Sequence, residues 1–249
     1  MTLQVLQISD CHLTDPGETF LGADTQQSLQ AVLAAALRQH QPDAIIASGD
    51  IAQKPAPATY RRFLATVRKQ ATAPLLCLPG NHDFLGAMQA ADLPMQSIDL
   101  VDTEVIWRLV ALDSHEDNKP SAVVTTADLA GLRESLTGAR WQYALLATHH
   151  PMVATSRWQD RDMITDAQWW LNDLQVHCQH RLRGIVCGHV HQALTGRVAD
   201  LPHWTTPSTC VQFRSNSEKF AVDSKAPGYR WLTLHTDGEI ETSSHYLSD

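Results

Sequence analysis

Short hydrophobic runs alternate along the chain with longer segments of helical pattern. Strands are predicted for residues 4–9, 43–48, 74–79, 104–114, 143–148 and 183–187. Helices are predicted for residues 24–40, 57–70, 84–91, 126–138 and 166–178. Asp24 is placed to cap the first helix, in which Leu29, Val32, Leu33 and Ala36 recur with helical spacing. Alternating strands and helices favour a layered α/β sheet with crossover helices.

The pattern changes after residue 196. Three strand-like segments, residues 203–213, 229–237 and 239–247, follow one another without helices between them. They predict a mixed, partly antiparallel sheet near the C-terminus. Because no repeat, low-complexity tract or Gly/Ser linker interrupts the sequence, we expect residues 1–249 to form a single domain.

Polar residues that can bind metals follow five of the predicted strands. They are Asp10 and His12; Asp50 after Gly49; Asn81, His82 and Asp83 after Gly80; His149 and His150; and His189 and His191 after Gly188. Ligand sites in α/β sheets lie beyond the carboxyl ends of strands, where several loops converge. Carboxylate, amide and imidazole groups together suit ions such as Fe, Mn, Zn or Co. The three glycines would let the backbone turn sharply and approach a ligand.

In order, these residues form the motifs D-x-H, G-D, G-N-H-D, H-H-P and G-H-x-H. The set resembles the calcineurin-like metallophosphoesterases, and the segments "LQISDCHL", "ASGDIAQ" and "LPGNHDF" are similar to the bacterial class III 3′,5′-cyclic-AMP phosphodiesterases within that superfamily. The C-terminal "TPSTCVQF" and "APGYRWLTLHTDG" extend the similarity over nearly the whole chain. The resemblance implies a four-layer α/β/β/α sandwich of two mixed sheets that holds two metal ions.

The resemblance also implies a role for each motif residue. One ion would be held by Asp10, His12, Asp50 and His191. The other would be held by Asp50, Asn81, His149 and His189, with Asp50 as the bridge. His82 would be the catalytic residue beside the substrate phosphate, without binding a metal. The residues expected to contact the substrate are His12, Asp50, Asn81, His82 and His191. The implied metals are iron and/or manganese, and zinc or cobalt would fit the same ligands.

Three residues next to the motif residues need separate interpretation. His150 could replace His149 as a ligand, although the resemblance favours His149. Cys11 should point away from the metals if the chain alternates there, and so serve in packing. In some relatives an acidic residue at the place of Gln53 orients the catalytic histidine, so here another residue would have to orient His82.

Residues outside these motifs are further candidates for lining the substrate pocket. Trp158 and Arg157 could reach this pocket. Cys210, Gln212 and Phe213, in the family-like segment, could either line a nucleotide pocket or pack inside the protein.

The charge and the cysteine content of the chain restrict its expected binding partners and location. The formal net charge of −8 repels phosphate backbones, so we expect no nucleic-acid partner. We expect no membrane association, because no hydrophobic run is long enough to span a bilayer and no signal peptide is recognisable. Five cysteines without a CxxC pair favour reduced thiols and a cytoplasmic location. The sequence favours no particular oligomeric state.

The resulting hypothesis is a dimetal hydrolase that cleaves the 3′ ester bond of 3′,5′-cyclic AMP to give 5′-AMP. Two alternatives stay open on the sequence. The first is a phosphodiesterase for another small molecule, such as a glycerophosphodiester, a 2′,3′-cyclic nucleotide or a nucleotide-sugar. The second is a regulatory protein that binds metal without catalysis.

Overall fold

The computed structural model describes residues 2–138, 140–215 and 217–247. The elements of the first half are β1 (Leu3–Ile8), α1 (Thr25–Gln39), β2 (Ala44–Ser48), α2 (Pro57–Gln70), β3 (Leu75–Leu78), α3 (Leu85–Gln89), β4 (Ile98–Asp102) and β5 (Val105–Ala111). Those of the second half are α4 (Thr126–Ser135), β6 (Tyr143–Ala147), the short 3₁₀ helix η1 (Asp160–Asp162), α5 (Ala167–His177), β7 (Leu182–Cys187), β8 (Thr195–Val198), β9 (Leu201–Thr205), β10 (Gly228–Leu234) and β11 (Ile240–Tyr246). The strands and helices predicted before residue 190 are all confirmed, within three residues at each end.

The strands form two sheets that pack face to face. The first has the order β11-β10-β1-β2-β3, and the second has the order β4-β5-β6-β7-β9-β8. In the first sheet β1, β2 and β3 run parallel while β10 and β11 are antiparallel additions. In the second sheet β5, β6, β7 and β9 run parallel between two antiparallel edge strands. Both sheets are therefore mixed, as predicted.

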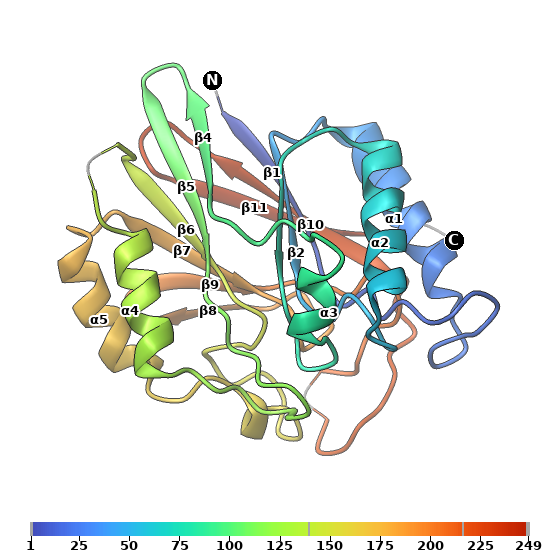
Figure 1. Cartoon of the computed structure of the whole chain (residues 1–249). Helices are drawn as coiled ribbons and strands as arrows, with labels where there is room; N and C mark the ends of the chain where they lie inside the picture. The colour runs from blue at the N-terminus through green and yellow to red at the C-terminus, as the bar shows by residue number, and fades with distance from the viewer. Residues whose placement is uncertain (1, 139, 216, 248–249) are drawn as a thin grey trace.

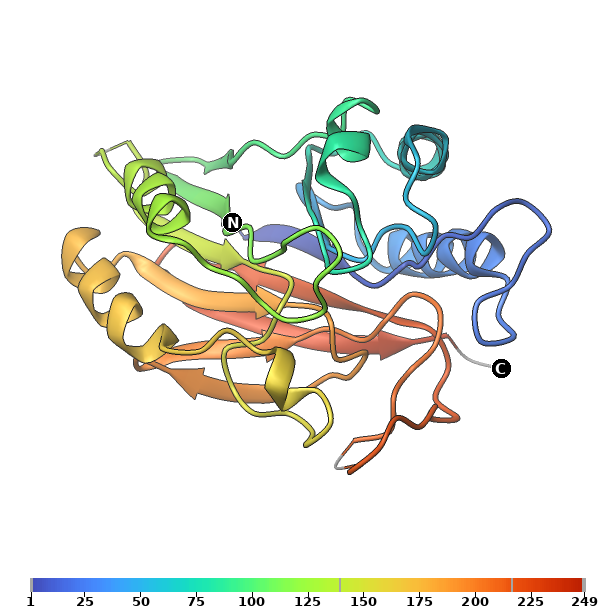
Figure 2. The same ribbon diagram turned by 60° about the horizontal axis from the view of Figure 1, so that its bottom comes forward.

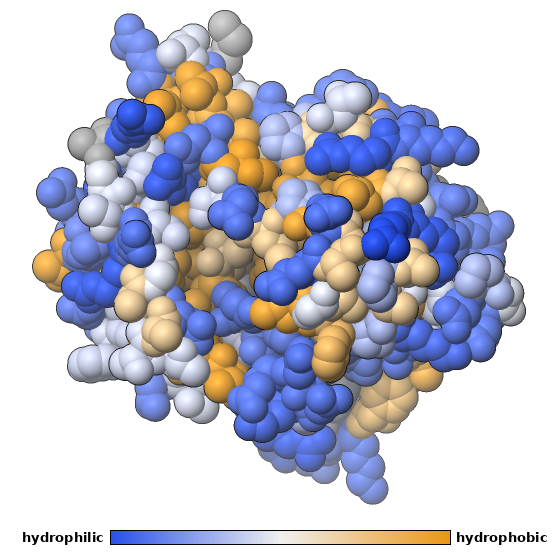
Figure 3. Space-filling model, viewed as in Figure 1, coloured by the Kyte–Doolittle hydropathy of each residue, from blue (hydrophilic) through white to orange (hydrophobic). Residues whose placement is uncertain are grey.

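Hydrophobic side chains fill three separate layers. Helices α1, α2 and α3 cover the outer face of the first sheet, and α4 and α5 cover the outer face of the second (Figure 1). Side chains of both sheets, such as Val5, Ile46, Leu145 and Val186, fill the layer between them. On the face shown in Figure 3, hydrophobic side chains are visible mainly between the two helical layers. The α/β/β/α sandwich is confirmed.

Local signals in the sequence explain why α1 begins and packs where it does. The carboxylate of Asp24 accepts a hydrogen bond from the backbone N–H of Gln27 at 2.9 Å, which is the predicted N-cap. The apolar stripe of α1 is fully buried against the first sheet. None of the helices formed by the described residues combines the length and hydrophobicity that crossing a bilayer requires.

Three strands differ from the sequence prediction. Strand β4 was not predicted, because only Leu100 and Asp102 of its five side chains are buried and its hydrophobic pattern is weak. The short edge strand β8 was not predicted either, because only Val198 of its four residues is buried. The prediction of one strand over residues 203–213 was wrong, because only its first three residues belong to β9. Pro207 has no N–H to donate to a sheet, and the chain leaves the sheet there.

The segment after β9 instead crosses the end of the first sheet. Thr209 N donates to the carbonyl of Ser9 at 3.0 Å, and Ser208 Oγ donates to the carbonyl of Asp10 at 2.8 Å. Figure 2 shows this connection (orange) and the one after β6 (yellow) extending beyond the ends of the strands. Both connections therefore lie on the side of the molecule where the motif residues follow their strands.

Candidate metal centre

The structure brings together the eight motif residues, which span 182 positions of the chain. They follow the carboxyl ends of β1, β2, β3, β6 and β7, so both sheets contribute. They are Asp10, His12, Asp50, Asn81, His82, His149, His189 and His191. Asn81 and His82 are partly exposed, whereas the other six are buried.

A first group of side-chain atoms surrounds one point beside β1. His12 Nε2 lies 3.1 Å from His191 Nε2 and 3.6 Å from Asp50 Oδ2. His191 Nε2 lies 3.4 Å from Asp10 Oδ1. The group contains the four residues that the sequence predicted for one ion.

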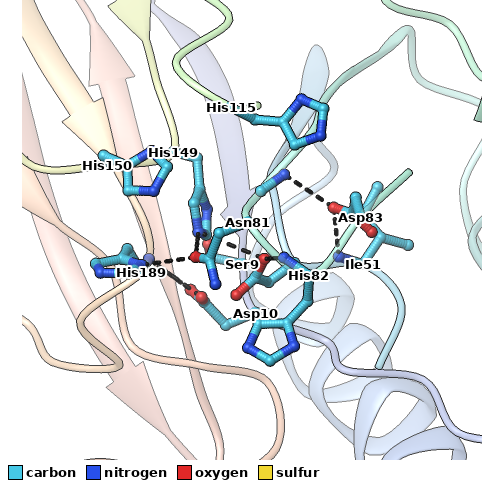
Figure 4. Close-up of polar contacts among 12 residues, drawn as sticks. Ser9, Asp10, Ile51, Asn81, His82, Asp83, His115, His149, His150 and His189 are labelled. Carbon is cyan, nitrogen blue, oxygen red and sulfur yellow. Dashed lines mark hydrogen bonds and ion pairs between the residues drawn. The ribbon is translucent and has the colours of Figure 1, made fainter. Parts of the chain in front are cut away.

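A second group lies on the other side of Asp50. Asn81 Oδ1 is 3.1 Å from His149 Nε2 and 3.0 Å from His189 Nδ1 (Figure 4). His149 Nε2 is also 3.5 Å from Asp50 Oδ1, so the two oxygens of Asp50 face the two groups. These are the four residues predicted for the other ion.

The spacing of these atoms suits metal coordination. Ligand atoms placed about 2.0–2.2 Å from an ion lie roughly 2.8–3.6 Å from one another in octahedral or tetrahedral geometry. All six separations quoted above, from 3.0 to 3.6 Å, fall within that range. The donor set of carboxylate, amide and imidazole groups therefore fits two cations that share Asp50.

The outer nitrogens of three imidazoles fix which nitrogen faces the centre. His191 Nδ1 donates to the carbonyl of Val211 at 2.6 Å, and His149 Nδ1 donates to the carbonyl of Ser48 at 2.8 Å. His12 Nδ1 donates to Gln53 Oε1 at 2.8 Å. In the neutral imidazoles the Nε2 lone pairs then point inward, where they repel one another unless a positive charge lies among them.

The titration behaviour of the group indicates the same need for positive charge. Burial acts to lower the pKa of His149, but the charges of Asp50 and Asp10, together with the hydrogen bonds to Asp50 and Ser48, outweigh it and raise that pKa to about 9. Burial lowers the pKa of His12 to about 3, although Asp50 opposes this. A proton on His149 would partly balance the carboxylates, and a divalent cation would balance them more completely.

The backbone is strained at five of the eight residues. Asp10, His12, Asp50, His189 and His191 have positive φ angles of 52°, 44°, 48°, 67° and 51°. Left-handed conformations of residues other than glycine cost of order 1–3 kcal/mol each and cluster at functional sites. The hydrophobic layers beneath the site must offset this strain.

The glycines of the motifs allow close approach of neighbouring segments. A Cβ on Gly188 would lie 2.0 Å from Ser9 Oγ and 2.7 Å from Asp10 Oδ2. A Cβ on Gly80 would lie 2.3 Å from the backbone N of Asp50. Only the third of these glycines, Gly49, also has a positive φ, of 94°. The predicted close approach is confirmed, and the predicted need for a special turn applies to Gly49 alone.

Asp83 was included among the strand-end residues by the sequence, which assigned it no role in the site. Its buried carboxylate accepts a hydrogen bond from the backbone N–H of Ile51 at 3.1 Å (Figure 4). It also accepts from the backbone N–H groups of Ala52 and Gly80 at 3.0 and 2.9 Å, and from Tyr60 Oη at 2.9 Å. Burial, and then the charge of Asp50, raise its pKa to about 6. Asp83 thus ties the loop carrying Asp50 to the loop carrying Asn81. Its position in the motif G-N-H-D was the only indication in the sequence that it belongs to the site.

His82 differs from the other histidines of the motifs. Its backbone N–H donates to Asp50 Oδ1 at 2.8 Å, while its ring packs edge-on against the ring of His12 with centroids 4.9 Å apart. Gln53, at the place where some relatives carry an acidic residue, contacts His12.

The structure places both nitrogens of His150 against protein atoms. Its Nδ1 accepts from Ser114 Oγ at 2.9 Å, and its Nε2 donates to the carbonyl of Pro120 at 3.1 Å. Burial and the nearby His149 lower its pKa to about 3. These contacts favour His149 over His150 as the inward-facing residue. Cys11 packs in the hydrophobic layer under α1, as predicted.

A cavity of about 330 Å³ opens from the two groups. The predicted substrate contacts all line it: His12, Asp50, Asn81, His82 and His191. Trp158 and Phe213 also line it, as do Phe20 and Phe220, which the sequence did not single out. Arg157 instead forms an exposed ion pair with Glu218, at 2.5 Å. Cys210 and Gln212 are buried in packing.

Comparison with known proteins identifies this arrangement. Residues 3–193 match the family described as calcineurin-like phosphoesterase. The chain belongs to the calcineurin-like phosphoesterase family. The resemblance inferred from the five motifs is therefore confirmed.

Curated relatives match the phosphoesterase along nearly its whole length. It is 36% identical to the 3′,5′-cyclic adenosine monophosphate phosphodiesterase CpdA of Vibrio vulnificus, over 99% of this chain and 91% of that protein. Identity to the CpdA of Escherichia coli K12 is also 36%, over 99% and 90% of the two chains. Identity to the CpdA of Pseudomonas aeruginosa is 36%, over 98% and 90%.

Solved structures share the fold at much lower identity. A dimetal phosphatase from Danio rerio matches with a TM-score of 0.58 and 15% identity, over 99% of each chain. The purple acid phosphatase PPD1 of yellow lupin matches with a TM-score of 0.64 and 11% identity, over 99% of this chain and 52% of that one. These similarities establish the fold of the phosphoesterase.

The close contact at Gly188 yields a testable prediction. We expect Gly188→Ala to lower the free energy of unfolding by about 1–3 kcal/mol, because the added methyl group forces Ser9 and Asp10 aside. Metal affinity should fall as Asp10 moves. Urea unfolding and metal titration measure the two effects. Gly86→Ala is the matched control, since a Cβ there meets nothing within 4 Å. Equal behaviour of the two variants would contradict the interpretation.

Proposed function

We propose that this phosphoesterase hydrolyses 3′,5′-cyclic AMP to 5′-AMP at the two atom groups that share Asp50. That shared carboxylate between two sets of inward-facing ligand atoms is the observation that carries the proposal. The 36% identity with CpdA proteins over nearly the whole chain supports this choice of substrate. The complete set of metal-competent residues argues against a non-catalytic regulatory protein.

We propose the ligand sets that the two groups suggest. Asp10, His12, Asp50 and His191 would hold one ion. Asp50, Asn81, His149 and His189 would hold the other. Iron and/or manganese are the proposed metals, and the same donors also suit zinc or cobalt. When bound, the pair would supply positive charge that neutralises phosphoryl oxygens and lowers the pKa of a water molecule.

The residues of the chain itself prepare the site for an anionic substrate. Only Asp10 and Asp50 contribute formal negative charge among the proposed ligands, while Asn81 and the imidazoles are neutral donors. Two divalent cations would therefore leave the site positive, despite the formal charge of −8 on the whole chain. This local field would attract the phosphodiester and orient it in the cavity.

We propose that His82 is the catalytic residue that acts on the leaving group. Its ring lines the cavity, and one of its nitrogens lies within 4.8 Å of ligand atoms of His12 and Asp50. An imidazolium at this position can stabilise charge on the phosphoryl oxygens or donate a proton to O3′ as the ester bond breaks. A water oxygen bonds to phosphorus as the P–O3′ bond breaks and O3′ takes up a proton, so that the phosphate stays on O5′ and the product is 5′-AMP.

The domain organisation and the location of the protein are also proposals. We propose that residues 1–249 act as one domain, which the pairing of β1 with both β2 and β10 supports. A cytoplasmic location is consistent with five cysteines that are all buried and free.

A substrate panel tests the proposed activity. Metal-replete protein should hydrolyse 3′,5′-cyclic AMP with a higher kcat/KM than 2′,3′-cyclic AMP, glycerophosphocholine, a nucleotide-sugar or a phosphomonoester. Chromatography of the product should give 5′-AMP without 3′-AMP. Preference for glycerophosphocholine, or 3′-AMP as the product, would refute the proposal.

His82→Ala tests the proposed catalytic residue. We expect turnover of cyclic AMP to fall by about 10²–10⁴-fold, because a positioned proton donor is lost. The metal content should stay that of the wild type, which elemental analysis checks. His177→Ala, on α5, is the histidine control and should retain full turnover. Wild-type turnover by a metal-replete His82→Ala protein would exclude this role.

A further inference from the structure

An aromatic wall adjoins the proposed metal centre on the side of His191. Phe213 stacks on the His191 ring with centroids 3.8 Å apart and an interplanar angle of 10°. Phe220 then packs edge-to-face on Phe213 at 5.2 Å, and Trp158 contacts both rings at 5.4 and 5.6 Å. We define Trp158, Phe213 and Phe220 as the aromatic wall. It extends the cavity outward from the position proposed for the phosphate.

The outer part of this wall is unusually exposed for aromatic side chains. Phe220 is 52% exposed, and Leu21, which also lines the cavity, is 47% exposed. Leaving such apolar surface in water at the entrance of a polar site costs free energy that burial would recover. A planar apolar group bound against the wall would bury this surface.

The chemistry of the proposed substrate supplies such a group. A cyclic nucleotide fixed by its phosphate near His191 carries its base one sugar ring away, and therefore inside the same cavity. Stacking on aromatic side chains binds the face of any base, because every base has a π-face. We propose that the aromatic wall, and Phe220 in particular, binds the nucleobase of the substrate by stacking. This inference rests on the proposed function and deepens it.

Two of the polar side chains beside the wall are already engaged within the protein. Gln159 already donates to the carbonyl of His189 at 3.1 Å and accepts from Ser156 Oγ at 2.9 Å. Asp162 accepts from Ser121 Oγ at 2.7 Å. The exposed Arg161 and Trp158 Nε1, which is unpaired among the described residues, are left as polar groups of the cavity that can contact the edge of a base stacked on the wall.

Phe220 is suited to a test, because it is exposed and lies outside the proposed metal and catalytic residues. We expect Phe220→Ala to raise the KM for cyclic AMP by roughly tenfold or more, with little change in kcat. Turnover of the base-free analogue ribose 3′,5′-cyclic phosphate should stay at the wild-type level. Phe220→Tyr should restore the KM for cyclic AMP. Val222→Ala, in the same segment and 40% exposed, is the control and should match the wild type.

A binding measurement provides a second readout. The inhibition constant of 5′-AMP should rise in Phe220→Ala by the same factor as the KM for cyclic AMP. The inhibition constant of ribose 5-phosphate should stay unchanged. An unchanged KM for cyclic AMP, or an equal loss of activity on cyclic AMP and on the base-free analogue, would overturn the proposal. Failure of the proposed function would differ, because the wild type itself would then not convert 3′,5′-cyclic AMP to 5′-AMP.

Discussion

The carboxylate of Asp50 lies between two groups of inward-facing ligand atoms, and the rest of the site depends on this arrangement. Its two oxygens are 3.6 Å from His12 Nε2 and 3.5 Å from His149 Nε2. Lone pairs and negative charge that converge in a buried site require a compensating positive charge. This requirement explains why imidazoles here donate their outer N–H to carbonyl oxygens and direct the other nitrogen inward.

The fold provides the rigidity that this arrangement needs. Five left-handed residues and three tightly packed glycines lie directly above strands whose side chains fill hydrophobic layers on both faces. Asp83 adds a polar tie between the loops after β2 and β3. The strain is thus confined to the ends of the strands, where loops from both sheets meet and a substrate can enter.

Features of the fold and of the site that depend on local sequence pattern could be predicted from the sequence. Helical spacing located α1, and the motifs after five strands located the eight residues of the site. Contacts between distant segments escaped this reasoning. The carbonyl of Val211 orients His191 from 20 positions away, and the segment around it has a strand-like composition although it forms a loop. Phe220 reaches the cavity only through the folded paths of residues 206–215 and 217–227, which no local pattern indicates.

The most direct test of the account is the metal content of active protein, measured by elemental mass spectrometry against protein concentration. The account predicts about two transition-metal ions per chain at full activity, because each oxygen of Asp50 faces a separate ligand group. Activity should disappear when a chelator removes the ions and return when they are restored. Full activity in protein that holds no transition metal would contradict the account.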